Sequence, residues 1–168
     1  MQIKKVCVIG GGLMGRQIAL NSAIYGIKSV VYDLSEAVCA DAEKWAEEYL
    51  AERIAKGRMT AEQVEQIKTR FAVVKDIKTA VADADLVIEA IYENLQAKQA
   101  VFQKLEDVCP DHTIFASNTS SISLTALAAA TKRPDRVIGM HFFSPVPKMR
   151  LCEVIFGLLT AQEVLSSI

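Results

Sequence analysis

The chain has 168 residues, of which 51% are hydrophobic, and its formal net charge is −1. This length fits a single domain, and this share of apolar residues supports a packed core rather than a disordered chain. Lysines and arginines are spread along the sequence without a basic patch, so neither nucleic acid nor an anionic membrane is an expected partner. No apolar run approaches the roughly 18 residues of a membrane span, and the N-terminus lacks the features of a signal peptide.

The cysteine and histidine content bears on the compartment and on metal binding. The four cysteines, Cys7, Cys39, Cys109 and Cys152, form no C-x-x-C pair and share no metal-ligand spacing with the two histidines. We therefore expect reduced, buried thiols, which suit a cytoplasmic protein. No metal site is expected from so few potential ligands.

The first predicted elements surround a glycine-rich loop. Residues 3–9 have the apolar, β-branched character of a buried strand, and residues 13–25 have helical apolar spacing. Between them, Gly10, Gly12 and Gly15 form the pattern G-x-G-x-x-G, which also occurs in ordinary turns. In a dinucleotide-binding loop, the first glycine allows a tight turn and the second lets a pyrophosphate approach the backbone. The third lets the helix pack closely, and the N–H groups of its first turn, including Leu13 and Met14, face the phosphates.

A second strand, over residues 28–33, ends in an acidic residue. Asp33 follows Gly15 by 18 residues, close to the roughly 20-residue interval expected for the acid that binds the adenosine ribose. The alternative is an Asp that leads a helix or forms a turn. Leu34 follows, no Arg or Lys is adjacent, and a carboxylate without a basic neighbour repels a 2′-phosphate. We therefore expect NAD rather than NADP as the cofactor.

The rest of the chain alternates strand and helix patterns. This alternation predicts an α/β fold with a doubly wound, mostly parallel sheet covered on both faces and an antiparallel strand at its edge. In chain order, the predicted elements are a helix over 35–56, a short helix opened by a Thr60–Gln63 capping box, strands over 71–74 and 85–90, a helix over 94–108, and strands over 113–116, 136–140 and 149–156.

Near the C-terminus, residues 160–163 read Thr-Ala-Gln-Glu, a second capping-box pattern that predicts the start of a helix. Only eight residues follow Thr160, and so short a helix is marginal unless it docks or continues. We therefore expect residues 1–168 to form one domain, the N-terminal part of a longer protein. The alternative is a small complete protein with a docked terminal helix.

One segment near the C-terminus carries candidate catalytic residues. His141 ends a strand, at the position where open α/β sheets bind ligands, and two prolines then force a turn into a returning strand. On that strand, Glu153 shares a face with Met149, Leu151 and Ile155 by the period of two. A carboxylate in an apolar row is costly unless it has a partner, so a His141–Glu153 pair suited to acid–base chemistry is predicted. The alternative for His141 alone is a structural histidine.

Residues 117–121, Ser-Asn-Thr-Ser-Ser, follow the strand over 113–116. By itself this run is typical of a turn or helix cap, but its place after a strand gives an alternative in which its hydroxyls bind cofactor or substrate oxygen. Together with the glycine loop, residues 88–94 and the stretch from His141 to Glu153, it resembles the L-3-hydroxyacyl-CoA dehydrogenases. The resemblance covers essentially the whole chain, as that family's N-terminal, Rossmann-type NAD-binding domain. His141 lies 12 residues before Glu153 and 21 after Ser120, as in that family.

The resemblance implies a role for each matching residue. His141 is the general base that removes the 3-hydroxyl proton while a hydride leaves for the nicotinamide, and Glu153 orients His141 and supports its charge. Ser120 bonds the reacting oxygen beside the nicotinamide. Glu93 and Lys98 match positions that contact the nicotinamide-side ribose, whereas the bare sequence reads both as a solvated helix start.

The chain departs from the family at several points. Ser144 stands where many members have Asn, although its hydroxyl can still hydrogen-bond the cofactor, and Phe156 stands where a charged residue is common. The family's second, helical domain, which completes the acyl site and much of a homodimer interface, is absent, so this chain alone is expected to catalyse poorly. In the family, CoA runs along the second helix, where Lys44, Arg53 and Lys56 either meet its phosphates or form a solvated face.

The leading hypothesis is therefore the cofactor half of an NAD-dependent, short-chain 3-hydroxyacyl-CoA dehydrogenase with an acyl-CoA substrate. A related alternative is a hydroxy-acid dehydrogenase of the gulonate type, which shares His141 and Glu153. A non-catalytic NAD-sensing module is the alternative from another class, but it has no use for Ser120, His141 and Glu153 together.

Overall fold

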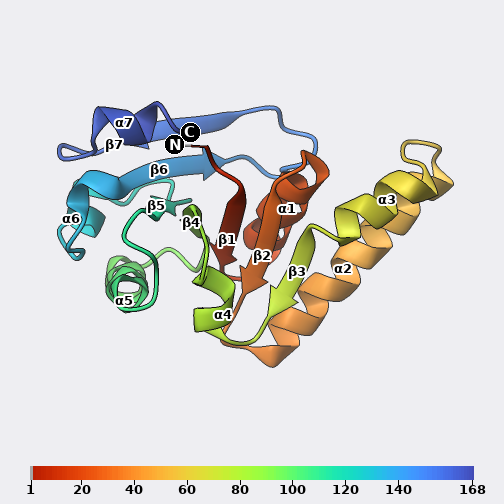
Figure 1. Ribbon diagram of the computed structural model, residues 1–168, viewed down its shortest axis with the longest axis horizontal. Coiled ribbons are helices and arrows are strands. Elements are labelled where there is room, and N and C mark those ends of the chain that lie inside the picture. The colour runs from red at the N-terminus through yellow and green to blue at the C-terminus, as the bar shows by residue number, and fades with distance from the viewer. Residues whose placement is uncertain (1) are drawn as a thin grey trace.

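The computed structural model describes residues 2–168 and shows one seven-stranded sheet (Figure 1). The strands are β1 Lys5–Ile9, β2 Lys28–Tyr32, β3 Phe71–Val74, β4 Leu86–Glu89, β5 Ile114–Ser117, β6 Val137–Phe142 and β7 Cys152–Phe156. Their order across the sheet is β3-β2-β1-β4-β5-β6-β7, and each neighbouring pair is parallel except β6 and β7. The predicted mostly parallel sheet with an antiparallel edge strand is confirmed.

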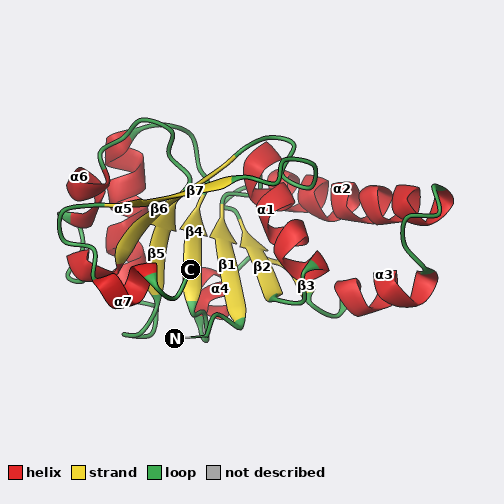
Figure 2. Ribbon diagram, turned by 90° about the horizontal axis from the view of Figure 1, so that it is seen from above, coloured by secondary structure: helices red, strands yellow, loops and turns green. Residues whose placement is uncertain are grey.

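Helices cover both faces of the sheet, as a doubly wound fold requires (Figure 2). They are α1 Leu13–Ile24, α2 Glu36–Ala55, α3 Ala61–Lys68, α4 Ile77–Val81, α5 Leu95–Glu106, α6 Leu124–Ala128 and α7 Gln162–Leu165, with a 3₁₀ turn, η1, at Pro134–Arg136. In Figure 2, α2 extends beyond the sheet and α3 returns beside it. Side-chain caps start several of these helices. Ser35 caps α2, Asn94 caps α5, and the predicted Thr60–Gln63 capping box opens α3.

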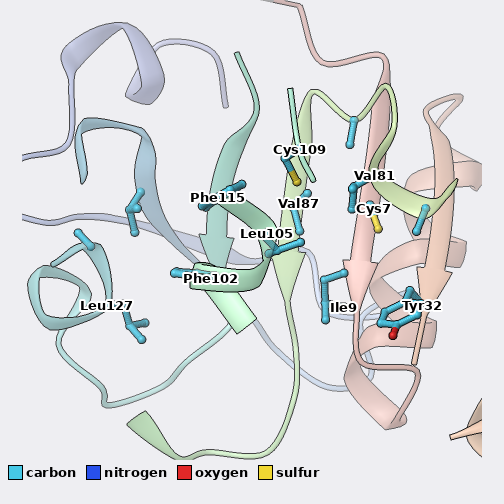
Figure 3. Close-up of a cluster of buried hydrophobic side chains, with 14 of the residues drawn as sticks. Cys7, Ile9, Tyr32, Val81, Val87, Phe102, Leu105, Cys109, Phe115 and Leu127 are labelled. Carbon is cyan, nitrogen blue, oxygen red and sulfur yellow. The ribbon is translucent and has the colours of Figure 1, made fainter. Parts of the chain in front are cut away.

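The core has two layers, because successive side chains of a strand point to opposite faces. On the α5 face, which α4, α5 and α6 cover, Cys7, Val87 and Phe115 pack against Phe102 and Leu105 (Figure 3). On the α1 face, which α1 and α7 cover, the alternate residues of the same strands form a second cluster. The α5 face therefore also receives Glu89 and Ser117, which follow Val87 and Phe115 by two residues.

The strand order reverses between β1 and β4. From β1 the chain proceeds outward through β2 to β3, and from β4 it proceeds the other way to β7. In open α/β sheets, ligands bind outside the carboxyl ends of the strands at this reversal. The glycine loop follows β1 directly, so the fold places it at that point.

Some predicted boundaries are wrong. The last strand was expected over 149–156, but β7 begins at Cys152, so Met149 and Leu151 lie outside it and the apolar row shortens to Glu153 and Ile155. The Thr160 hydroxyl does not cap α7. Instead it donates to the Val137 carbonyl at 2.7 Å and accepts from the Gly157 N–H, which ties the turn to β6.

Helix α4 was not expected, since five residues are too few to show a period. Among residues 2–168, no helix combines the length and apolar character needed to cross a membrane.

Candidate active site

The glycine loop has the geometry that each glycine was expected to provide. Gly10 has φ +106°, and a Cβ there would lie 2.7 Å from the Ala90 carbonyl oxygen. A Cβ on Gly15 would lie 1.7 Å from the Gly10 carbonyl oxygen, so only glycine lets α1 pack this close to the loop. A Cβ on Gly12, by contrast, would have no heavy atom within 4 Å. Gly12 therefore leaves open space over the backbone at the start of α1, as a pyrophosphate needs.

Asp33 follows β2 and is anchored to the same loop. One carboxylate oxygen accepts the Gly11 N–H at 2.8 Å, and the other accepts the Ser35 N–H at 2.9 Å. These bonds hold the side chain at the rim of a cavity of about 510 Å³, whose lining includes Gly10, Gly12 and Asp33. The lining is mostly apolar and includes Tyr32, Leu34, Val38, Ile77, Ile91, Tyr92 and Val101.

The residues of this cavity fit a dinucleotide. An apolar cavity next to a carboxylate suits an adenosine, and the open backbone at Gly12 suits the phosphates beside the positive end of α1. Leu13, at the start of α1, is 56% exposed, and Met14 behind it is half-buried. Both stand in the first turn, where N–H groups have no partner within the helix.

A second group of side chains gathers at the same edge of the sheet. His141 and Glu153 are directly opposed in the antiparallel register of β6 and β7, so their side chains share a face. His141 Nδ1 lies 2.7 Å from a Glu153 carboxylate oxygen, and His141 Nε2 lies 3.0 Å from the Ser120 hydroxyl. The Phe143 ring packs against the imidazole with centroids 4.7 Å apart. The predicted His–Glu pair is present in the structure, with Ser120 on its other side.

Behind Ser120 lies a network of charged residues. The Lys98 ammonium, 1% exposed, lies 2.7 Å from a Glu89 oxygen and 3.2 Å from a Glu93 oxygen. Glu93 in turn accepts the Thr119 hydroxyl and the Ser120 N–H. Burial pushes the pKa of Glu93 upward, but the bonds from Thr119 and Lys98 outweigh it and leave that pKa below its usual value. The carboxylate is therefore the form that the site stabilises.

The solvated interpretation of Lys98 is wrong, and the sequence contains a signal against it. Lys98, Phe102 and Leu105 lie on the buried stripe of α5, at the spacing i, i+4, i+7. A cation on an apolar stripe needs a buried partner, and Glu89, which ends an apolar strand, provides it. Glu93 fits the solvated interpretation better, since its side chain is 42% exposed.

Asn118 and the loop after β6, which contains Ser144, connect the site to neighbouring elements. Asn118 accepts the Phe142 N–H at 2.9 Å and so joins the ends of β5 and β6. Ser144 lies exposed in the loop after β6. The Val146 N–H in that loop donates to the buried Gln17 side chain of α1 at 2.8 Å, which joins the loop after His141 to the helix of the glycine loop.

A smaller cavity of about 360 Å³ lies between α2 and this loop. Of the three basic residues that the resemblance placed near CoA, two line this cavity and one does not. Arg53 and Lys56 line it together with Arg58 and Lys148. Lys44 is not in the lining, and its exposed side chain lies 3.9 Å from Glu48. The buried Nε of Arg53 has no hydrogen-bond partner within residues 2–168.

Among the residues that the structure describes, no group of three or more His, Cys, Asp or Glu side chains that could hold a metal ion is found. All four cysteines are free, with Cys7, Cys39 and Cys109 buried. The fold and the site thus define a dinucleotide-binding domain of the dehydrogenase class, with a His–Glu pair at the same sheet edge as the cofactor loop.

Comparisons with known proteins identify the family. Residues 5–168 match the family described as 3-hydroxyacyl-CoA dehydrogenase, NAD binding domain. The chain belongs to this family, whose cofactor is NAD. It is 45% identical to a 3-hydroxyadipyl-CoA dehydrogenase of Escherichia coli over all of its own length and 35% of the relative's. It is 44% identical to a probable 3-hydroxybutyryl-CoA dehydrogenase of Bacillus subtilis, over 97% of this chain and 56% of that protein.

A solved structure agrees with this assignment. The crystal structure of 3-hydroxybutyryl-CoA dehydrogenase from Escherichia coli superimposes with a TM-score of 0.95 at 44% identity, covering 99% of this chain and 35% of that one. The chain therefore spans between about a third and just over half of the length of these relatives.

Proposed function

We propose that this chain is the N-terminal, cofactor-binding part of a longer NAD-dependent enzyme that interconverts L-3-hydroxyacyl-CoA and 3-ketoacyl-CoA. The observation that carries the proposal is the contact of His141 with Glu153 at 2.7 Å and with Ser120 at 3.0 Å, at the edge where the glycine loop lies. A domain that only sensed NAD would need the loop and Asp33 but not this group. The names of the relatives support the acyl-CoA class of substrate.

The chemistry follows from the two ring nitrogens of His141. A carboxylate only accepts hydrogen bonds, so Nδ1 carries the proton facing Glu153, and Nε2 keeps a lone pair. Nε2 is then the general base for the 3-hydroxyl proton, and the Glu153 charge stabilises the imidazolium that forms. The Ser120 hydroxyl, 3.0 Å from Nε2, bonds the same reacting oxygen. Bound NAD supplies the acceptor for the hydride. In the reducing direction, the imidazolium returns the proton.

We assign the nicotinamide-side ribose to Glu93 and Lys98, and a further hydrogen bond to the cofactor to the Ser144 hydroxyl. Asp33 supports NAD over NADP, since its carboxylate stands at the rim of the cavity without an adjacent cation in the sequence. The CoA phosphates are assigned to the 360 Å³ cavity, where Arg53 and Lys56 offer positive charge and Arg53 Nε has an unused donor. Lys44 has no part in this proposal.

Four further proposals concern the complete protein: its acyl chain length, its continuation beyond this chain, its oligomeric state and its compartment. A short acyl chain is supported by relatives named for 3-hydroxybutyryl-CoA. A continuation beyond residue 168 is supported by exposed apolar residues near the C-terminus, where Phe156 and Leu158 are 67% and 88% exposed. We propose that the complete protein is a homodimer, which sedimentation velocity would test. We also propose that it is cytoplasmic, as the free thiols suit a reducing compartment.

The first experiment is a calorimetric titration of this chain with NADH and, in parallel, with NADPH. Binding that prefers NADH would support the site built from Gly10 to Asp33. Binding that prefers NADPH would refute the assignment of Asp33. Absence of binding to either would mean that these residues alone do not make a cofactor site.

The second experiment measures turnover by the complete protein of acetoacetyl-CoA and of a free hydroxy acid such as gulonate. Turnover of the free acid alone would overturn the acyl-CoA proposal. His141→Ala is expected to lower turnover by roughly two to four orders of magnitude, the range of general acid–base catalysis. The matched control is His112→Ala. His112 is half-exposed and lies beside Asp85, before the start of β5, whereas His141 lies near the end of β6. Equal activity of the two variants would refute the general-base role.

A further inference from the structure

Glu89 is a fully buried carboxylate that ends β4 and to which the proposed mechanism assigns no role. One oxygen accepts from the Lys98 ammonium and from the Ile91 N–H, both at 2.7 Å, and the other accepts from the Ser117 hydroxyl at 2.6 Å. A carboxylate removed from water is costly unless such partners surround it. A simple core position would be cheaper with an apolar residue, as at the three preceding residues of β4.

Two chains of contacts lead from Glu89 to the backbone of residues 119 and 120, next to the Ser120 hydroxyl that touches His141. In the first, the Ser117 hydroxyl bound to Glu89 accepts the Thr119 N–H at 3.2 Å. In the second, the Lys98 ammonium bound to Glu89 also contacts Glu93 at 3.2 Å. Glu93 then accepts the Ser120 N–H at 3.1 Å as well as the Thr119 hydroxyl. Both chains end on the backbone of residues 119 and 120.

We propose that Glu89 is a positioning residue, which fixes the backbone of Thr119 and Ser120 and thereby holds the Ser120 hydroxyl against His141. This proposal takes its catalytic meaning from the proposed function, whereas the positioning itself is a property of the chain without cofactor. Ser120 is exposed, so packing of its own side chain does not hold it. The hydrogen bonds that the Ser120 and Thr119 N–H groups donate to Glu93 and Ser117 therefore fix the loop.

Glu89→Gln is the informative variant. Glu89 accepts three hydrogen bonds and donates none, whereas an amide has a single accepting oxygen and an NH₂ group that only donates. With the Gln oxygen facing Lys98, the NH₂ group faces the Ser117 hydroxyl, which must rotate to accept from it; in the reverse orientation the NH₂ group faces the Lys98 ammonium. In both orientations Lys98 loses its fully buried counter-charge, so the chain of contacts through Lys98 is weakened. The size of the side chain hardly changes.

Amide hydrogen exchange, followed by NMR on the ¹⁵N-labelled chain, measures the loop directly. We expect the Thr119 and Ser120 amides to exchange at least ten times faster in Glu89→Gln, after correction for the change at the core amides of Val87 and Phe115. Core amides report global unfolding, so the correction removes a general loss of stability. Acceleration of all four amides by one common factor would overturn the proposal, since Glu89 would then be structural only.

Glu106→Gln is the matched control. Like Glu89, Glu106 is a mostly buried carboxylate that forms an ion pair, with its oxygen 3.2 Å from Arg133 Nε. It lies on α5, the helix that carries Lys98. In this variant, the amide exchange rates of Thr119 and Ser120 are expected to change by the same factor as those of the core residues Val87 and Phe115. A selective acceleration at Ser120 in this control would also overturn the proposal, because loosening of α5 would then suffice.

A second variant covers the case in which Glu89→Gln does not fold. Ser117→Ala removes one chain of contacts and leaves the buried ion pair intact. The Thr119 amide is expected to exchange several-fold faster relative to the core, and an unchanged ratio would overturn the proposal.

In the complete protein, Glu89→Gln is expected to lower kcat by about 100-fold, the effect of a misplacement of about 1 Å, with a smaller change in KM for the acyl substrate. An enzyme that turns over no acyl-CoA at all would refute the proposed function, while the exchange data would still decide the positioning role. A KM increase with unchanged kcat would refute positioning of the reacting groups.

Discussion

One added methyl group is expected to have opposite consequences at Gly15 and at Gly12. A Cβ on Gly15 would lie 1.7 Å from the Gly10 carbonyl oxygen, whereas a Cβ on Gly12 would meet nothing within 4 Å. The carbonyl oxygen belongs to the backbone and has no rotamer by which to move aside. In Gly15→Ala, α1 must therefore shift away from β1 and disturb the buried Ile18. Overpacking typically costs about 1–3 kcal/mol, and a backbone collision this close belongs at the upper end, near 3 kcal/mol.

That loss corresponds to a fall in Tm of roughly 6–12 °C for a domain of this size, measured by circular dichroism. For Gly12→Ala, a lower entropy of the unfolded chain and a poorer helix cap oppose each other, so Tm should stay within about 2 °C. The same methyl group occupies the space left for the pyrophosphate. We therefore expect NADH to bind at least about tenfold more weakly to Gly12→Ala, a loss of about 1.4 kcal/mol.

Three results would count against this reasoning. If Gly12→Ala bound NADH as tightly as the unaltered chain, the phosphates would not pass over Gly12. If Gly15→Ala kept its Tm, the close approach of α1 to Gly10 would not constrain the fold. A loss of Tm in Gly12→Ala would also count against the open space found there.

Three further predictions concern other parts of the site and core. Gln17→Ala leaves the buried Val146 N–H without its acceptor, which costs about 1–3 kcal/mol and lowers Tm by roughly 2–12 °C; an unchanged Tm in this variant would contradict the prediction. The pKa of Glu93 is depressed in the folded chain, so its contribution to stability is present above its ordinary pKa near 4.5 and disappears as the pH falls through the folded value. Urea unfolding of Glu93→Gln should accordingly lose less stability than the unaltered chain between pH 7 and pH 3, and identical pH profiles would contradict this. Burial raises the pKa of the half-buried Cys152 thiol to about 11 and raises that of the fully buried Cys7 further. A thiol reagent at pH 8 should therefore label Cys152 slowly and Cys7 only after unfolding, whereas equal rates in the folded chain would contradict the assigned burial.

The sheet and the glycine loop could be predicted from the sequence because their signals are local. The strand patterns, the spacing from Gly10 to Gly15 and the interval to Asp33 each lie within a few dozen residues. The His141–Glu153 pair was also predictable, since the two residues lie on strands joined by one turn. The start of β7 was not, because apolar residues at Met149 and Leu151 continue the strand pattern beyond the hydrogen-bonded strand.

The network behind Ser120 was harder to predict because its parts lie far apart in the chain. Ser117 lies 28 residues after Glu89, and a hydroxyl-rich run is equally typical of a plain turn. The resemblance to a family pointed to Glu93 and Lys98 but not to Glu89. A buried partner for Lys98 could have been sought on chemical grounds, yet its identity depends on which strand lies beside α5, and that is a property of the folded sheet.

Because β6 and β7 run antiparallel, His141 and Glu153 lie on the two strands of a single hairpin. His141 and Glu153 face each other through the ladder of hydrogen bonds, so the turn between the strands can change in length without separating them. A shift of β7 by a single residue, however, would turn the Glu153 carboxylate to the α1 face and bring Val154 opposite the imidazole. An insertion between residues 153 and 154 should thus displace the carboxylate and abolish acid–base function in a domain that still folds, while an insertion among the exposed residues 148–150 should be tolerated.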